Sequence, residues 1–141
     1  MQPSSYEKDF YKWSNEQAML LRIGDYSHAD ITNIVEEIES LGRRDKRSLK
    51  SEIRRLLHHM LKLNYAMQYK GNSNSWDSSI LTARKHINDL LEDSPSLTKE
   101  LHKIVVDVYE DSLSLAIADC CHNEELFPKK CPWTIEKILK D

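Results

Sequence analysis

Apolar residues recur every three or four positions along most of the chain, which is the spacing of one face of an α-helix. No alternation of apolar and polar residues is long enough to predict a strand instead. The pattern therefore predicts an all-α protein, a compact helical bundle of about six helices in a single domain over residues 1–141.

The first three predicted helices are separated by glycines. The first ends at Gly24, and the second begins after Asp30 as N-cap and stops at Gly42. The third runs over residues 45–69 and leads into a polar loop over residues 70–75. Each of the three has an apolar stripe along one face, so each is expected to pack on one side.

The last three predicted helices differ in how they pack. The fourth begins at Trp76 and ends before Pro95, where the fifth begins. Pro132 opens a short sixth helix. The fifth helix is predicted to be central and packed on two sides, because it carries a main stripe and an opposite second stripe. The main stripe is Leu97, Leu101, Ile104, Val108 and Leu115, and the second is Val106, Leu113 and Ile117.

Several of these stretches resemble the bacterial family known as domain of unknown function 29, and the resemblance covers nearly the whole chain. The residues that carry it are Tyr6–Trp13, Glu36–Arg43, His59–Lys62, Leu91–Leu97, Tyr109–Asp111 and Cys131–Thr134. The resemblance implies an all-helical bacterial protein. It implies no reaction, ligand or catalytic residue.

Composition narrows the function classes. The 20 basic and 23 acidic residues give a net charge of −3, so nothing global attracts nucleic acid or an anionic membrane. The longest apolar runs are far shorter than the roughly 20 residues needed to cross a bilayer. Three cysteines without an apparent export signal predict reduced thiols and a cytoplasmic location. We therefore expect neither nucleic-acid nor membrane partners.

Basic residues crowd the start of the third helix, where the helix dipole favours acids. Arg47, Lys50, Arg54 and His58 follow one strip of that helix and are weak candidates for binding a phosphate-bearing ligand. Proteins that bind single-stranded nucleic acid add aromatic side chains on which the bases stack, and few aromatic residues accompany this strip. The favoured interpretation is that these charges pair with the acidic second helix or face solvent.

A second hypothesis for the third helix is catalysis. Arg54 followed by His59 fits the short Arg-x4-6-His pattern of helical HEPN nucleases, although the two lie about 140° apart on a regular helix. Glu52, Arg55 and His59 instead line one flank of the apolar stripe. The weak catalytic candidates are therefore His59, Arg54, Arg55 and Glu52, with His59 as general acid or base and an arginine stabilising phosphate charge.

No metal or cofactor site is predicted. Cys120, Cys121 and Cys131 lack the spacing of a zinc knuckle, and Asp119 and His122 share one helical face without further ligands. The acidic residues of the second helix diverge, and the chain has no Glu-x-x-His pair for a di-iron site. No phosphate loop or nucleophile elbow appears either.

Three polar residues lie within apolar stripes and are expected to be buried. Asn64, Ser112 and Asp119 are predicted to form either a functional site or a structural network. The favoured function is a non-catalytic helical interaction protein that forms a homo-oligomer or binds a protein partner. The alternative is a helical phosphodiesterase or nucleic-acid-binding protein that uses the basic third helix.

Overall fold

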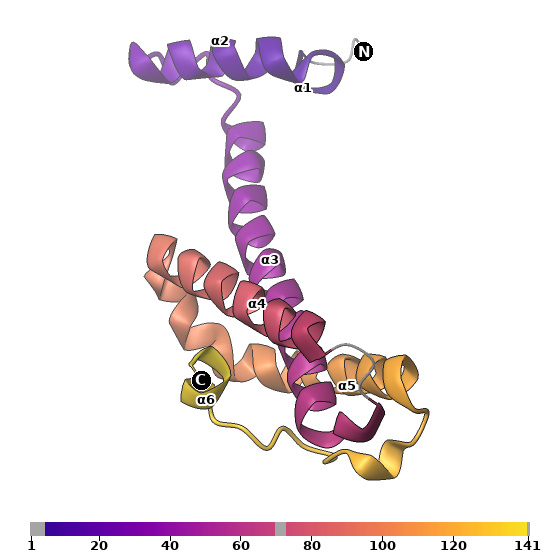
Figure 1. The fold of residues 1–141 in the computed structure, drawn as a ribbon. Coiled ribbons are helices and arrows are strands. Elements are labelled where there is room, and N and C mark those ends of the chain that lie inside the picture. The colour runs from indigo at the N-terminus through magenta and orange to yellow at the C-terminus, as the bar shows by residue number, and fades with distance from the viewer. Residues whose placement is uncertain (1–4, 70–72, 141) are drawn as a thin grey trace. The chain divides into compact units, whose positions relative to one another are not determined.

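The computed structural model describes residues 5–69 and 73–140, and the chain is all-α over these residues (Figure 1). They form six α-helices and three short 3₁₀ helices, with no strand among them, which confirms the predicted fold class. The chain divides into two compact units, unit 1 (residues 1–44) and unit 2 (residues 45–141). The single domain expected from the sequence stays a prediction.

Unit 1 contains helix α1 (Ser5–Lys8), helix α2 (Phe10–Arg22) and the first part of helix α3 (Ile31–Tyr65). The sequence predicts one helix where the structure has α1 and α2. The break lies at Asp9, whose carboxylate accepts a hydrogen bond from the backbone N–H of Lys12 (3.1 Å). Asp9 therefore acts as the N-cap of α2.

The interior of unit 1 is small. Trp13 is its one buried side chain among the described residues, and the Trp13 indole Nε1 donates a hydrogen bond to Asp30 Oδ2 (3.0 Å). The rings of Tyr6 and Phe10 pack against that indole, and the Tyr6 hydroxyl donates to Glu37 Oε1 (2.5 Å). Polar contacts and one aromatic cluster hold this unit together, not an extensive apolar core.

The predicted stop at Gly42 is wrong, because helix α3 continues without interruption from Ile31 to Tyr65. A glycine C-cap needs a left-handed backbone, which Gly24 has at φ 81° and Gly42 does not. Glycine inside a helix costs only about 1 kcal/mol relative to alanine. No proline or capping sequence follows Gly42, so the hydrogen-bonded helix is the more stable alternative. Residues 67–69 then form a 3₁₀ helix beyond the end of α3.

Unit 2 packs the rest of α3 against helix α4 (Ser73–Asp93) and helix α5 (Leu101–Cys120). Residues 70–72 of the predicted loop lie outside the described residues, and residues 73–75 begin α4. The core consists of buried aliphatic side chains from all three helices, among them Leu49, Ile53, Leu56, Leu57, Leu61, Ile87 and Ile104.

Helix α5 differs from its prediction in two respects. The segment Pro95–Glu100 forms a 3₁₀ helix before α5 begins. The second stripe is only partly packed, because Val106 is 64% exposed, and Leu115 of the main stripe is 45% exposed. The face of α5 that carries Ile104 and Val108 is buried. The opposite side of α5 is thus left partly open rather than covered.

The C-terminal segment returns to the core. After a 3₁₀ helix (Glu124–Leu126), helix α6 (Ile135–Leu139) lies beside α4 (Figure 1). Thr134 caps α6 by accepting a hydrogen bond from Lys137 N–H (3.2 Å), so this helix begins later than the predicted Pro132. Arg84 Nε donates to the carbonyl oxygen of Ile138 (2.9 Å) and thereby satisfies the end of α6.

None of the helices in the described part of the chain combines the length and apolarity that a membrane span requires.

Candidate functional site

A polar cluster lies near the C-terminal end of α3. Lys62 is buried to 4% exposure, and its ammonium group donates a hydrogen bond to Asp119 Oδ2 of α5. His58 Nε2 lies 3.2 Å from the same oxygen, and the Lys62 nitrogen lies 4.8 Å from the ring centre of Trp76 on α4. The hydrogen bond from Lys62 lowers the pKa of Asp119. A carboxylate and a π-face thus offset the buried positive charge of Lys62.

His59 is neutral at physiological pH. Burial, together with the neighbouring charges of His58, Lys62 and Arg55, lowers its pKa to about 4. Its ring stacks on that of His58, with 4.7 Å between the ring centres. The Nδ1 atom of His59 is buried without a hydrogen-bond partner. At neutral pH an imidazole with this pKa is a proton acceptor rather than an acid, which disfavours the predicted role of His59 as general acid but not its role as general base.

Glu52 and Arg55 lie close together on α3, as their spacing on one flank of the apolar stripe predicts. One Arg55 guanidinium nitrogen lies 3.8 Å from Glu52 Oε1. His86 Nδ1 of α4 lies 3.4 Å from the same oxygen, a contact that sequence reasoning missed because nothing in the pattern aligns the two helices. Glu52 Oε2 is buried without a hydrogen-bond partner.

The predicted phosphate-binding strip is not one patch of available charge. Arg54 Nε lies 3.7 Å from Asp111 Oδ2 of α5, and His58 also pairs with a carboxylate of that helix. Arg47 is exposed and Lys50 is half-buried. Arg54 and His58, two of the four candidates, therefore contact carboxylates of α5. Arg54 lies beside Asp111 and not beside His59.

The predicted buried network is wrong. Asn64 is exposed, and its amide donates to the backbone oxygen of Met60 (2.7 Å) in its own helix. Ser112 is fully buried, and its hydroxyl oxygen lies 3.1 Å from the carbonyl oxygen of Arg54. The Asp119 side chain is 50% exposed. The three residues have separate partners, because a stripe fixes which side of a helix faces inward but not how deeply each position is covered.

The cysteines are free thiols. Burial raises the pKa of Cys120 to about 12 and also raises the pKa of Cys131, so neither is a reactive thiolate at neutral pH. His122 lies beyond the end of α5 with φ 52°, and thus does not share a helical face with Asp119 as predicted. Among the described residues, no three His, Cys, Asp or Glu side chains are grouped to hold a metal ion.

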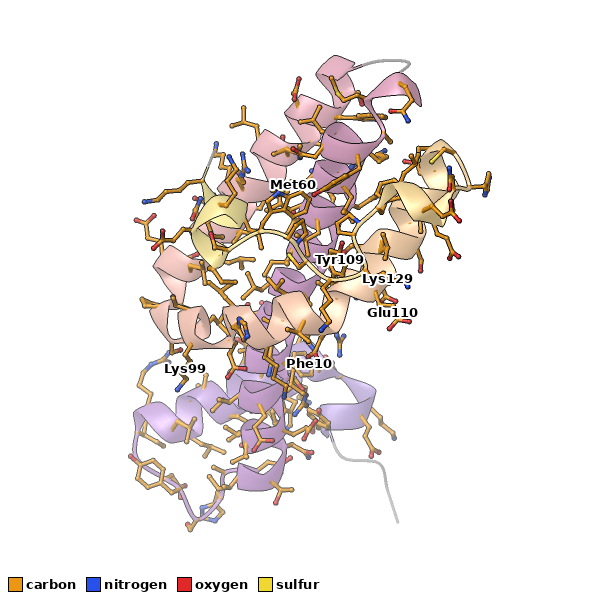
Figure 2. All side chains as sticks on the ribbon, turned by 90° about the horizontal axis from the view of Figure 1, so that it is seen from below. Phe10, Met60, Lys99, Tyr109, Glu110 and Lys129 are labelled. Atoms are coloured by element: carbon orange, nitrogen blue, oxygen red, sulfur yellow. The ribbon has the colours of Figure 1, made fainter. Side chains whose placement is uncertain are left out.

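An apolar groove of about 950 Å³ lies between α5 and the segment over residues 129–135. The Tyr109 hydroxyl donates to the carbonyl oxygen of Pro128 (2.6 Å) and anchors this segment; burial raises the pKa of Tyr109, so its phenol keeps its proton. Figure 2 shows Tyr109, Glu110 and Lys129 around this region. The apolar lining includes Val105, Val106, Leu113, Trp133 and Ile135. This groove is not among the sites predicted from the sequence. The signal that the sequence offers is the pair of adjacent lysines, Lys129 and Lys130, ahead of a short apolar helix.

Lys129, Lys130 and His102 make the polar part of this groove mainly basic, with Glu110 as the one acidic side chain among the described lining residues. Both lysines are exposed. Within the part of the chain that the structure describes, neither lysine forms an ion pair.

An exposed apolar surface lies in unit 1. We define the exposed stripe as Ile31, Val35, Ile38 and Leu41 of α3, whose side chains are 45–63% exposed. Its residues follow helical spacing, so they form one continuous face about 15 Å long. Glu37 and Glu39 flank this face on its two sides, at about 100° from it. The surface is therefore apolar in the middle and charged at its edges.

Comparison with known proteins identifies a family. The model of the family described as Domain of unknown function DUF29 matches residues 5–141. No curated protein and no solved structure matches the chain.

Proposed function

We propose that this chain, which belongs to the Domain of unknown function DUF29 family, is a non-catalytic assembly protein that binds a second copy of itself through the exposed stripe. The description of the family names no reaction, so the proposal rests on the chain's own surface.

The observation that carries the proposal is the exposure of the stripe. Ile31, Val35, Ile38 and Leu41 follow one another at helical spacing, yet each is about half exposed. Burying such side chains is worth roughly 1.5–3 kcal/mol each, and a monomer leaves much of that stabilisation unused. Contiguous apolar patches of this kind typically mark sites of protein association.

The state of the polar side chains supports a role without catalysis. Lys62 is paired with Asp119, and Arg54 lies beside Asp111. His59 is neutral and has no proton to donate at neutral pH. A phosphodiesterase needs a proton donor and an uncommitted cation at one place, and this geometry does not favour that combination.

A second copy is the partner that the charges favour. The flanks of the exposed stripe are acidic, at Glu37 and Glu39, whereas unit 2 carries exposed basic residues such as Lys129 and Lys130. One chain therefore bears both members of a complementary pair of surfaces.

The test is the mass of the protein in solution, measured by light scattering over a wide range of concentrations. The native chain is expected to reach twice the 16.5 kDa monomer mass. Ile38→Glu should raise the dissociation constant at least tenfold, about 1.4 kcal/mol, because it places a charge in the middle of the stripe. Ser51→Glu adds the same charge at an exposed position of α3, ten residues beyond the stripe, and should leave the constant unchanged.

A native chain that remains monomeric at every concentration contradicts the proposal, as does equal weakening by the two variants.

The location that we propose is the cytoplasm. Three free cysteines, two of them adjacent, support a reducing compartment.

A further inference from the structure

We infer that the groove between α5 and residues 129–135 of one copy receives the exposed stripe of α3 from a second copy. This inference rests on the proposed function and adds to it the receiving surface and the mode of recognition.

The size and the apolar lining of the groove suit a helical partner. Its volume of about 950 Å³ lies at the upper end of the range of about 300–1,000 Å³ for small-molecule pockets. Its walls come from α5 on one side and from an irregular segment that ends at the start of α6 on the other. Amphipathic helices bind in such grooves through anchors at positions i, i+4 and i+7. Ile31, Val35 and Ile38 have this spacing.

The apolar lining is open to a partner. Val106 of α5 lines the groove and is 64% exposed, although it belongs to a helix whose other face is buried. Trp133 and Leu113 lie partly buried in the same lining. Large apolar and aromatic side chains of this kind, partly covered in the monomer, typically provide the anchor pockets of interfaces.

The charges of the two surfaces are opposite in sign. The stripe has one acidic residue on each side: Glu37, which accepts a hydrogen bond from Tyr6, and Glu39, whose Oε2 lies 3.6 Å from an exposed Arg43 guanidinium nitrogen. The groove has Lys129 and Lys130 at its edge, and neither is engaged in an ion pair among the described residues. Docking the stripe would bring acidic side chains toward free lysines around an apolar centre, which is the arrangement that selects partner and orientation.

Basic residues elsewhere on the chain offer a weaker match. Arg43 already lies 2.8 Å from Glu36, Lys46 lies 3.4 Å from Glu100, and Arg54 pairs with Asp111. None of these three lines the groove. The groove therefore combines uncommitted positive charge with an open apolar surface.

The experiment reverses charges on the two surfaces separately and then together. Lys129→Glu/Lys130→Glu and Glu37→Lys/Glu39→Lys should each raise the dissociation constant of the dimer about tenfold or more, because like charges then face each other. The chain that carries all four substitutions should return to within about threefold of the native constant, because the pairs are restored with opposite sign.

Two matched controls accompany these variants. Lys99→Glu/Lys103→Glu makes the same change of charge on exposed lysines that do not line the groove, and Figure 2 shows Lys99 well away from Lys129. Tyr6→Phe removes the hydrogen bond to Glu37 without reversing any charge. Both controls should leave the dissociation constant unchanged, and circular dichroism establishes that every variant is helical.

The outcomes separate this inference from the proposed function. A native dimer that Ile38→Glu weakens but that the groove variants leave intact overturns the groove as the receiving surface, while the stripe remains the binding face. If the chain with all four substitutions does not regain the native dissociation constant, the proposed charge pairing is overturned. If Lys99→Glu/Lys103→Glu raises the dissociation constant as much as the groove variant does, the effect is general electrostatic repulsion and not pairing at the groove. A monomeric native chain overturns both proposals.

Discussion

Lys62 is the one basic side chain that is buried in the described part of the chain, and its surroundings explain how a charge is tolerated there. Asp119 neutralises it and the ring of Trp76 covers it. The sequence could not predict this pairing, because Lys62 lies off the apolar stripe of α3 and its carboxylate is 57 residues away. What periodicity does predict is that Glu52 and Arg55 share a flank, since neighbours on one helix have a fixed geometry.

His59 gives the stability of the protein a pH dependence. Its pKa is about 4 in the folded chain and about 6.5 when unfolded, so between these values the unfolded state binds more protons. Stability is therefore complete above about pH 6.5 and falls as the pH is lowered toward 4. From pH 7 to pH 5 we expect a loss from His59 of about 1–2 kcal/mol, reduced for its partial exposure.

Urea unfolding at pH 7 and pH 5 measures this loss. His59→Gln removes the titrating group and should make the difference between the two pH values smaller. An unaltered pH dependence in His59→Gln would show that the ring is not held neutral by burial.

At the scale of elements, α3 shows what a sequence pattern can decide. Its stripes and those of α4 and α5 follow from local spacing, and the structure has these helices. Whether the helix stops at Gly42 depends on two free energies that the apolar pattern does not contain. Keeping a glycine inside a helix costs little, whereas ending the helix leaves backbone groups without hydrogen bonds and costs more. The partly open side of α5 likewise depends on where residues 129–135 run, which no spacing rule determines.

The continuity of α3 predicts the effect of substituting Gly42. An added methyl group meets no atom within 4 Å there, and the backbone is helical, so Gly42→Ala should stabilise the protein by about 0.5–1 kcal/mol. Gly24→Ala is the matched comparison and should destabilise, because Gly24 has φ 81°. Both belong in an Ile38→Glu background, where self-association does not contribute to the free energy of unfolding.

The free energy of unfolding of Gly42→Ala, measured by heat or urea, tests whether α3 is continuous or is two helices separated at Gly42, as the sequence predicts. Destabilisation by Gly42→Ala would indicate a left-handed glycine and a helix that ends there.

At the scale of the whole molecule, each unit has an apolar surface that is open to a partner. Unit 1 has the exposed stripe with acidic flanks, and unit 2 has the groove with two free lysines. Composition and stripes predict an interaction protein only in general terms. The pairing that we propose rests on side chains that the fold gathers along the α5 groove, and it makes the general expectation specific enough to test.

The central claim is most directly tested by mixing two defective chains. Ile38→Glu damages the stripe and keeps the groove, and Val106→Glu damages the groove and keeps the stripe. Each alone is expected to remain near the 16.5 kDa monomer mass. In an equimolar mixture, the intact stripe of one can bind the intact groove of the other, so light scattering should show the mass rising toward twice that value. A mixture that stays at the monomer mass, under conditions where the native chain is a dimer, would contradict the account.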